Sequence, residues 1–496
     1  METIDGGAEP TGVAGLDQIL RGGLPGGHMY LLEGASGAGK TTLGLQFLME
    51  GLRRGQRVLW CTLAETEKQL RAIARSHDWD LQGLDILNIA HDLRASGMLD
   101  DEYTFFSPGD VELQDVMRSV ADRVRRLRPA RIVFDPFSDV ELLARDPLRF
   151  RRQLMQFREL FAETGTTALL IQEHALERSR EPSGEGLMHG IIALYQTAPA
   201  YGKPRRRLRV HKLRGLDYRE GFHDVALRSG GLVVYPRLTA EEHQLPEEGG
   251  LMRSGSVELD AMLGGGLDRG ASLLVVGPSG AGKSTLCTQF ALERARHGER
   301  AVIFLFDETA RAFLRRADGL AMPLRERIAQ GLVNLVQVNP AEFSPGEFAH
   351  RVRHAVEETG ACLLAIDSLN GYMSGMPDEK HLAMHMHELL SYLALRNVAT
   401  LLTLNQSGAL GESGSEAGDI THMTDATLLL RYFEDGGAVR RAAAVLKRRC
   451  GPHEEAIRDM RIAKGGVFFG AALQSLQGIL TGQPDRVDAS SPPEQE

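Results

Sequence analysis

Long hydrophobic runs, cysteines and excess positive charge are all scarce in this sequence, and each scarcity excludes a class of protein. No run approaches the roughly 18 to 20 apolar residues that a membrane span needs. The formal net charge of −9 argues against a chain that mainly coats nucleic acid. The first residues lack the basic start and apolar stretch of a secretion signal, so we expect a cytoplasmic protein. The few cysteines stand singly, which predicts neither a disulfide framework nor a zinc site; they are Cys61, Cys287, Cys362 and Cys450.

What the chain does contain is one glycine-rich pattern written twice. The pattern G-x-x-x-x-G-K-[ST] is met within residues 34–42 and within residues 277–285, each time after an apolar run and before apolar residues at helical spacing. Glycines let backbone N–H groups converge on phosphate oxygens, and the helix that follows adds its positive end. A plain glycine-rich turn is the alternative, but the lysine and hydroxyl residue in both copies argue against it. The predicted nucleotide-binding residues are Gly37, Gly39, Lys40, Thr41, Thr42, Gly280, Gly282, Lys283, Ser284 and Thr285.

The two copies belong to a duplicated domain. Aligning Lys40 with Lys283 gives an offset of 243 residues, and the same offset matches residues 22–24 with residues 265–267. A period of this length indicates two copies of a whole domain. In each copy apolar runs alternate with helical stretches, which predicts an α/β fold whose mostly parallel sheet is covered by helices on both faces. The predicted buried strands are 29–32, 58–63, 131–134 and 167–171, then 273–276, 301–306, 363–366 and 399–403.

Shifts of pattern mark the boundaries between parts of the chain. Residues 206–212 and 222–235 alternate and turn at glycine, which predicts antiparallel strands added at the edge of the first sheet. Residues 239–250 are acidic and carry proline and glycine, as in a linker. The polar end of the chain is predicted to be disordered. The predicted division is a first domain over 1–238, a linker over 239–250, a second domain over 251–477 and a tail over 478–496.

Acidic residues at the ends of predicted strands are candidates for metal binding and catalysis. Asp135 and Asp367 each end an apolar strand, where a carboxylate binds the shell of a Mg²⁺ ion. Glu65 closes the strand after the first helix, and Asp307 and Glu308 do so in the second copy; a carboxylate there can polarise an attacking water or hydroxyl. An ordinary solvated strand end is the alternative for each. The predicted metal residues are therefore Thr41, Asp135, Ser284 and Asp367.

Two basic clusters occupy similar places late in each copy, at residues 211–214 and residues 446–449. If they project from edge strands at a subunit boundary, they can enter the neighbour's nucleotide site and neutralise charge on the γ-phosphoryl group. A solvated charged face is the alternative. The candidates for this role are Lys212, Arg214, Lys447 and Arg449.

Residues 418–425 carry threonine hydroxyls that could accept phosphate. On the residues alone, threonines that cap a turn are the stronger interpretation of this stretch.

Together these features resemble the KaiC family, the ATPases and autokinases of bacterial clock systems. The resemblance covers roughly residues 10–475 and is carried by the two glycine-rich loops, the opening Thr11-Gly12-x-x-Gly15-Leu16-Asp17, and the Lys-Leu-Arg-Gly block at 212–215. It implies two tandem RecA-like P-loop NTPase domains that stack as two hexameric rings, with ATP and Mg²⁺ between neighbouring subunits. In such an assembly the first ring mainly hydrolyses ATP and the second phosphorylates itself.

The resemblance also assigns roles to single residues. The second ring keeps an acidic pair, with Asp307 in place of the usual glutamate base, whereas the first ring has Glu65 behind Ala64. The family's adjacent serine and threonine phosphoacceptors fall on Thr421 and His422, so Thr421 is the predicted phosphoacceptor. The short polar end of the chain implies a timer or signalling ATPase that works without a KaiA-like activator, and a KaiB-like partner fits the family.

Two other functions stay open on the sequence. A RecA- or DnaB-like ATPase that moves along DNA would use the same core, and DNA-stimulated turnover would favour it. The acidic balance and the lack of an obvious DNA-binding appendage argue against it. A scaffold that uses ATP only to assemble rings is the second, and turnover at background level in an intact hexamer would support it.

Overall fold

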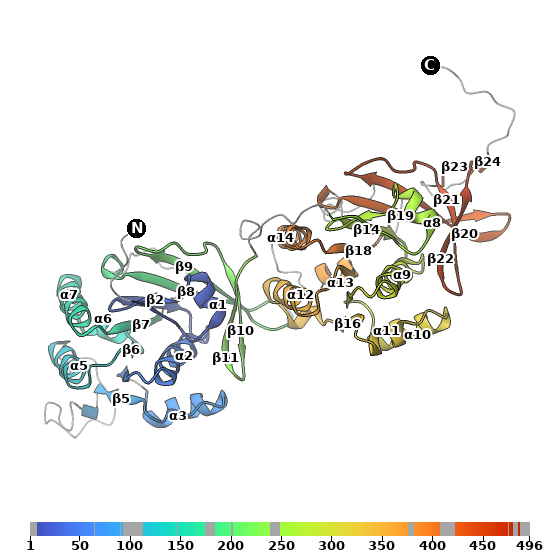
Figure 1. Cartoon of the computed structure of the whole chain (residues 1–496). Coiled ribbons are helices and arrows are strands. Elements are labelled where there is room, and N and C mark those ends of the chain that lie inside the picture. The colour runs from blue at the N-terminus through green and yellow to red at the C-terminus, as the bar shows by residue number, and fades with distance from the viewer. Residues whose placement is uncertain are drawn as a thin grey trace, which may run out of the picture. The chain divides into compact units, whose positions relative to one another are not determined.

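A computed structural model describes two compact units, Met1–Arg237 and Leu238–Glu496, coloured from blue to green and from green to red in Figure 1. No helix in the described part of the chain is long and apolar enough to cross a membrane. The predicted linker and tail lie mostly outside the described residues and stay predictions. The structure describes residues 7–63, 65–89, 91–92, 113–144, 146–173, 184–199, 202–238, 249–374, 381–406, 422–474, 476–479 and 485–486.

Each unit is built on one nine-stranded sheet, and the two sheets have the same topology. In the first unit the order is β11-β10-β9-β8-β3-β7-β6-β4-β5, and the second repeats it as β22-β21-β20-β19-β14-β18-β17-β15-β16. Six neighbouring strands of each sheet are parallel and the other three are antiparallel. The predicted α/β fold with two mostly parallel sheets is thereby confirmed.

The strands of the first sheet are β3 (Met29–Gly34), β4 (Val58–Thr62), β5 (Asp85–Asn88), β6 (Arg131–Phe134), β7 (Thr167–Glu173), β8 (Gly190–Thr197), β9 (Arg205–Leu213), β10 (His223–Arg228) and β11 (Gly231–Tyr235). Those of the second are β14 (Ser272–Gly277), β15 (Ala301–Leu305), β16 (Val333–Gln337), β17 (Leu363–Asp367), β18 (Ala399–Asn405), β19 (Ala426–Asp435), β20 (Ala438–Arg448), β21 (Arg458–Ala463) and β22 (Gly466–Ala472).

Helices cover both faces of each sheet. The described helices of the first unit include α1 (Ala14–Ile19), α2 (Lys40–Arg53), α3 (Glu67–Ser76), α5 (Leu113–Leu127), α6 (Ser138–Ala144) and α7 (Pro147–Thr164). Those of the second include α8 (Val257–Met262), α9 (Lys283–Arg296), α10 (Ala310–Gly319), α11 (Leu324–Ala329), α12 (Pro345–Thr359), α13 (Leu369–Ser374) and α14 (Leu382–Leu395). In Figure 1, α5, α6 and α7 lie on one side of the first sheet and α1 and α2 on the other.

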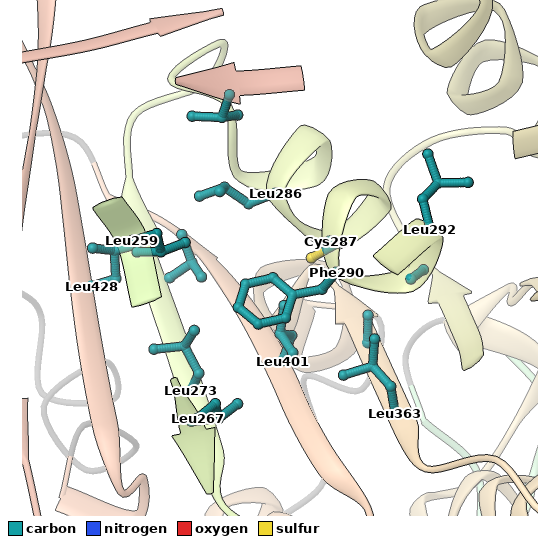
Figure 2. Packing of buried hydrophobic residues seen from close by; sticks show 14 of the residues in the cluster. Leu259, Leu267, Leu273, Leu286, Cys287, Phe290, Leu292, Leu363, Leu401 and Leu428 are labelled. Atoms are coloured by element: carbon teal, nitrogen blue, oxygen red, sulfur yellow. The ribbon is translucent and has the colours of Figure 1, made fainter. Parts of the chain in front are cut away.

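The core of each unit has two layers because successive side chains of a strand point to opposite faces of the sheet. On β14, Leu273 packs in the layer that contains α9, and its neighbour Leu274 packs in the layer that contains α12 and α14. Figure 2 shows the first layer, where Phe290 of α9 lies near Leu273 and Leu401. Parallel strands that are buried on both faces therefore read as continuous apolar runs, which is why the sequence predicts β3, β4, β6 and β7 and their counterparts in the second unit.

The start and end of the long helices follow local chemistry. In α7 the Asp146 side chain caps the first turn by accepting from the Leu148 N–H, and in α12 Ser344 accepts from Glu347 in the same way. Both helices carry proline in the first turn and end at a glycine in the left-handed conformation. The two helices are not counterparts in the repeat, because α7 precedes β7 whereas α12 precedes β17, the counterpart of β6. Their shared signals therefore reflect local helix chemistry.

The structure leaves all four cysteines as free thiols. Cys61 and Cys287 are buried, and burial raises the pKa of both thiols. Cys362 precedes β17, is half-buried and packs against the core of the second unit.

One charged side chain is fully enclosed in the first unit. The Arg131 guanidinium donates to the Glu9 carboxylate at 2.6 Å and to the carbonyls of Pro10 at 2.6 Å and Phe47 at 2.9 Å. It also donates to the Gln56 side chain at 2.7 Å and lies over the Phe47 ring. Because every arm of the fork has a partner, Arg131 ties the segment before α1 to α2 and to β6.

We expect Arg131→Ala to lower the free energy of unfolding of the first unit by about 3 kcal/mol, because Glu9 keeps a desolvated charge without its partner. Both tryptophans, Trp60 and Trp79, lie in the first unit, so tryptophan fluorescence during urea unfolding of the full chain reports on this unit alone. The control is Arg71→Ala, which removes an exposed pair with Glu67 and should cost less than about 0.5 kcal/mol. Equal shifts in the two variants would contradict the expectation.

Candidate functional site

The two glycine-rich loops have the geometry of phosphate cradles. In the second unit β14 ends at Gly277 and α9 begins at Lys283, with Gly282 between them at φ 114°. The left-handed backbone favours glycine. Gly280 has a left-handed backbone too, at φ 76°, and an added Cβ there would stand 2.9 Å from the Tyr432 hydroxyl.

The lysine of each loop bends back over its own loop. Lys283 Nζ donates to the carbonyls of Gly277 at 2.7 Å and Pro278 at 2.8 Å. In the first unit Lys40 Nζ makes the matching pair of bonds, both at 2.8 Å. Burial lowers the pKa of each lysine, although nearby carboxylates partly oppose the shift. Each ammonium group is therefore positioned at the mouth of its loop.

A cavity of about 510 Å³ opens at the second loop. It brings together predicted residues from three parts of the unit: the loop and α9, the turn after β15 and the end of β17. Its lining is formed by Ser279, Gly280, Gly282, Lys283, Ser284, Thr285, Asp307, Glu308, Arg316, Gly319, Leu320, Asp367, Asn405 and Ile462.

Hard oxygen donors that suit Mg²⁺ stand at both loops. In the first unit Thr41 Oγ1 donates to Asp135 Oδ2 at 2.7 Å, and burial is the main cause that raises the pKa of Asp135. In the second unit Thr403 Oγ1 donates to Asp367 Oδ1 at 2.5 Å, while Asp367 Oδ2 is buried with no hydrogen-bond partner among the described residues. An orphaned carboxylate oxygen beside Ser284 fits a hydrated cation.

Glu65 stands as a nearly unpartnered carboxylate in the first unit. Its Oε2 atom is buried and finds no hydrogen-bond partner among the described residues. Burial, and then repulsion from Asp135, raises its pKa to about 7. A carboxylate with this pKa can both accept and release a proton near neutral pH.

The acidic pair of the second unit is held differently. Asp307 accepts a hydrogen bond from the Ser368 hydroxyl, whereas Glu308 forms a bidentate ion pair with Arg316 at 2.5 and 2.9 Å. Sequence reasoning missed Arg316, although its place eight residues after Glu308 on a predicted helix was a usable signal. It also missed Ser368 and Thr403, whose roles depend on strands meeting at one sheet edge.

The basic clusters do not lie on edge strands, so that expectation is wrong. β9 lies between β8 and β10, and β20 lies between β19 and β21. The reason is that two further strands follow each of them along the chain and extend the sheet. The register of β9 with β10 nevertheless stops at Leu208, so the end that carries Lys212 runs past its outer neighbour.

Each basic cluster lies at the opposite end of its sheet from its own phosphate loop. Lys212 pairs with Ile191 of β8, which pairs with Leu31 near the start of β3, whereas the loop follows Gly34 at the end of that strand. Lys447 likewise pairs with Thr427 of β19 near the start of β14. The separation is roughly 10 Å along the strands and roughly 10 Å across them.

The cationic groups of these clusters bind backbone carbonyls of their own unit. Lys212 Nζ donates to Glu185 O at 3.1 Å and Arg214 Nη2 to Gly186 O at 2.8 Å. In the second unit Lys447 Nζ donates to Thr424 O at 2.7 Å, and Arg449 Nη2 donates to the carbonyl of His422. Thr421, the predicted phosphoacceptor, lies outside the described residues.

The other end of β9 does reach its own loop. Arg206 donates from Nε at 3.4 Å and from Nη2 at 3.3 Å to the carbonyl of Gly37. Sequence reasoning did not single out this arginine, because a run of arginines gives no sign of which member faces the loop.

Comparison with known proteins adds the following findings. A family model described as "ATPase: KaiC" matches residues 9–239 and residues 252–473. The chain is 28% identical over 478 residues to "Circadian clock protein KaiC3" of Synechocystis sp., which covers 96% of this chain and 94% of that protein. It is 26% identical to proteins called "Circadian clock oscillator protein KaiC" of Picosynechococcus sp. over 480 residues and of Synechococcus elongatus over 486, each covering 96% of this chain and 92% of the relative.

The raised pKa of Glu65 predicts how the stability of the first unit depends on pH. Because the folded state binds this proton more tightly than the unfolded state, its stability falls as the pH rises from about 4.5 through about 7. Glu65→Gln removes that loss. The melting temperature of the variant, measured by tryptophan fluorescence, should therefore exceed that of the wild type at about pH 8 and equal it at about pH 5. A Glu67→Gln control changes an exposed carboxylate, and the same response from both variants would refute the assignment.

Proposed function

The chain belongs to the KaiC family of ATPases, and from that premise we propose that it is a homohexameric double-ring ATPase whose second unit phosphorylates its own chain. Each unit contributes to one ring and binds MgATP between neighbouring subunits. The observation that carries the proposal is the position of the basic clusters, which lie in both units at the far end of the sheet from the chain's own phosphate loop.

A head-to-tail ring explains that position. In such a ring the carboxyl ends of the parallel strands in one subunit face the next subunit, so one subunit supplies the loop and the other the cations. The guanidinium and ammonium groups of Arg214 and Lys212 now hold single backbone carbonyls. A phosphate oxygen is a stronger partner for both, because the acceptor is charged.

In the first site the chain's own residues bind the nucleotide and orient water. Lys40 holds the β- and γ-phosphates, while Thr41 and Asp135 face the metal position. When bound, Mg²⁺ neutralises charge on the phosphate oxygens. We assign the Glu65 carboxylate as the group that polarises the attacking water. Its pKa of about 7 means that a fraction of the molecules can accept a proton at neutral pH.

In the second site the acceptor of the phosphoryl group is a side chain. The Thr421 hydroxyl oxygen forms a bond to the γ-phosphorus, the bond from that phosphorus to the β–γ bridging oxygen breaks, and the hydroxyl proton passes to Asp307. We assign Asp307 as the base, because it lines the cavity at the phosphate loop and stands where the family has its glutamate base. The cluster supports this acceptor, because Arg449 binds the carbonyl of the adjacent His422 and so would carry that segment into the neighbour's site.

Partners follow from the same proposal. The net charge of −9 disfavours a nucleic-acid track, and a KaiB-like protein is the partner that the family suggests. We propose no KaiA-like activator.

Subunit mixing tests whether the first site is shared. In a Lys283→Ala background, which silences the second site, both Lys40→Ala and Lys212→Ala/Arg214→Ala should lose ATP turnover. Mixed in equal amounts before MgATP is added, the two variants should recover about a quarter of it, because about a quarter of the interfaces pair an intact loop with an intact cluster. Absence of recovery in a mixture that sediments as a hexamer, or a protein that stays monomeric in saturating MgATP, would contradict the ring.

Labelling tests the kinase. Purified protein incubated with γ-labelled ATP should carry label at Thr421, and Thr421→Ala should lose the label while it keeps ATP turnover. Ser415→Ala, a hydroxyl residue in the same stretch, should keep both. An acid-labile label at His422 would point to different chemistry, and no label at all would leave an ATPase without kinase activity.

A further inference from the structure

In the second site, the ion pair with Glu308 holds the Arg316 guanidinium at the cavity beside the phosphate loop. Arg316 projects from α10, where both of its terminal nitrogens bind Glu308 and its guanidinium lies 4.9 Å from the centre of the Phe313 ring. About a third of the Arg316 side chain and a quarter of the Glu308 side chain stay accessible. Both residues line the cavity at the phosphate loop.

The charged groups that line the cavity indicate how Arg316 could distinguish between nucleotides. Lys283 and Arg316 line it together with the carboxyl groups of Asp307, Glu308 and Asp367. A nucleoside triphosphate brings about one more negative charge than the diphosphate. Each cation that lines the cavity therefore favours the triphosphate, and an arginine that is paired only with a carboxylate can change partners.

The described residues of the first unit contain no counterpart of the Glu308–Arg316 ion pair. The offset of 243 residues places Ile73 opposite Arg316 and Glu65 opposite Glu308. Ile73 packs against the core beside α2, and one oxygen of Glu65 has no hydrogen-bond partner among the described residues. The phosphate cradle itself is the same in both units, so Arg316 adds something that nucleotide binding as such does not require.

We propose that Arg316 is a specificity-determining residue of the second site, which exchanges Glu308 for the third phosphate of a bound nucleoside triphosphate. This inference rests on the proposed function, in that the second unit must bind ATP. The planar fork fits a phosphate as well as it fits a carboxylate. With a diphosphate bound, the third phosphate is missing and the guanidinium stays on Glu308, so the pair reports which nucleotide occupies the site.

Nucleotide titration of the second site tests the exchange. The full chain carries Lys40→Ala to silence the first site, and calorimetry in Mg²⁺ compares ADP with the β,γ-imido analogue of ATP. We expect Arg316→Gln to weaken the analogue about 10-fold and ADP less than about 2-fold, as for the loss of one charge-assisted hydrogen bond. The matched control is Arg315→Gln, an exposed arginine on the same helix, which should change neither by more than about 2-fold.

Substitution of Glu308 gives the opposite sign and separates exchange from a structural ion pair. Glu308→Gln removes the competitor, so the analogue should bind as tightly as before or more tightly. The double variant Glu308→Gln/Arg316→Gln should again bind it about 10-fold more weakly than Glu308→Gln alone, with no repulsion from a stranded carboxylate. Arg316→Lys keeps the charge and should lose less than Arg316→Gln, which preserves the test if the glutamine variant misfolds.

Several outcomes would overturn the inference. Equal losses of ADP and analogue affinity in Arg316→Gln would show a structural pair, and so would weakening of both nucleotides in Glu308→Gln. If the Lys40→Ala protein binds neither nucleotide, the proposed function of the second unit fails and the inference with it. If it binds both and Arg316→Gln behaves like Arg315→Gln, the inference alone fails.

Discussion

The direction of the parallel strands is the constraint on which the rest of this structure depends. A strand that ends in a glycine-rich turn presents its last carbonyls and the following helix N-terminus at one end of the parallel strands. That end gathers the phosphate loop, Asp135 or Asp367, and the acidic residues that follow the next strand. β9 and β20 run the other way, so their final residues pair with the starts of their neighbours β8 and β19. The phosphate loop and the basic cluster of each unit are thereby held at opposite ends of its strands.

The two units share this arrangement of strands and differ in whether one carboxylate, Glu65 or Glu308, has an ionic partner. Glu65 is half-buried and has no ionic partner in the part of the chain that the structure describes, and the cost of desolvating its charge appears as a pKa near neutrality. Glu308, at the matching position, is paired with a bidentate arginine. At the position of Arg316 the first unit carries Ile73, so no guanidinium is available there to pair with Glu65. Sites of the same backbone geometry are in this way given different electrostatics.

Local sequence information accounts for much of the fold. Strands such as β3, β6 and β17 are buried on both faces and so appear as apolar runs, and α7 and α12 carry caps and glycines at their ends. β5 and β16 were not predicted, because each is an edge strand with several half-exposed residues and gives no such run. β8 has an apolar run that was overlooked. Arg131 reads as a strand-opening arginine, and nothing near it in the sequence reveals that three other segments close around it.

The sequence by itself determined that there are two phosphate loops, that they belong to a duplicated α/β domain, and which acidic residues close the strands beside them, because glycine geometry, apolar periodicity and the repeat are all local properties of the chain. Only the tertiary structure decided that β9 and β20 are internal strands and that the basic clusters lie at the end of the strands opposite to the phosphate loop. It also decided that Glu308 has an ionic partner while Glu65 has none among the described residues. Those facts depend on strand order and on which helix covers which strand end, and these are set by contacts between residues far apart in the chain.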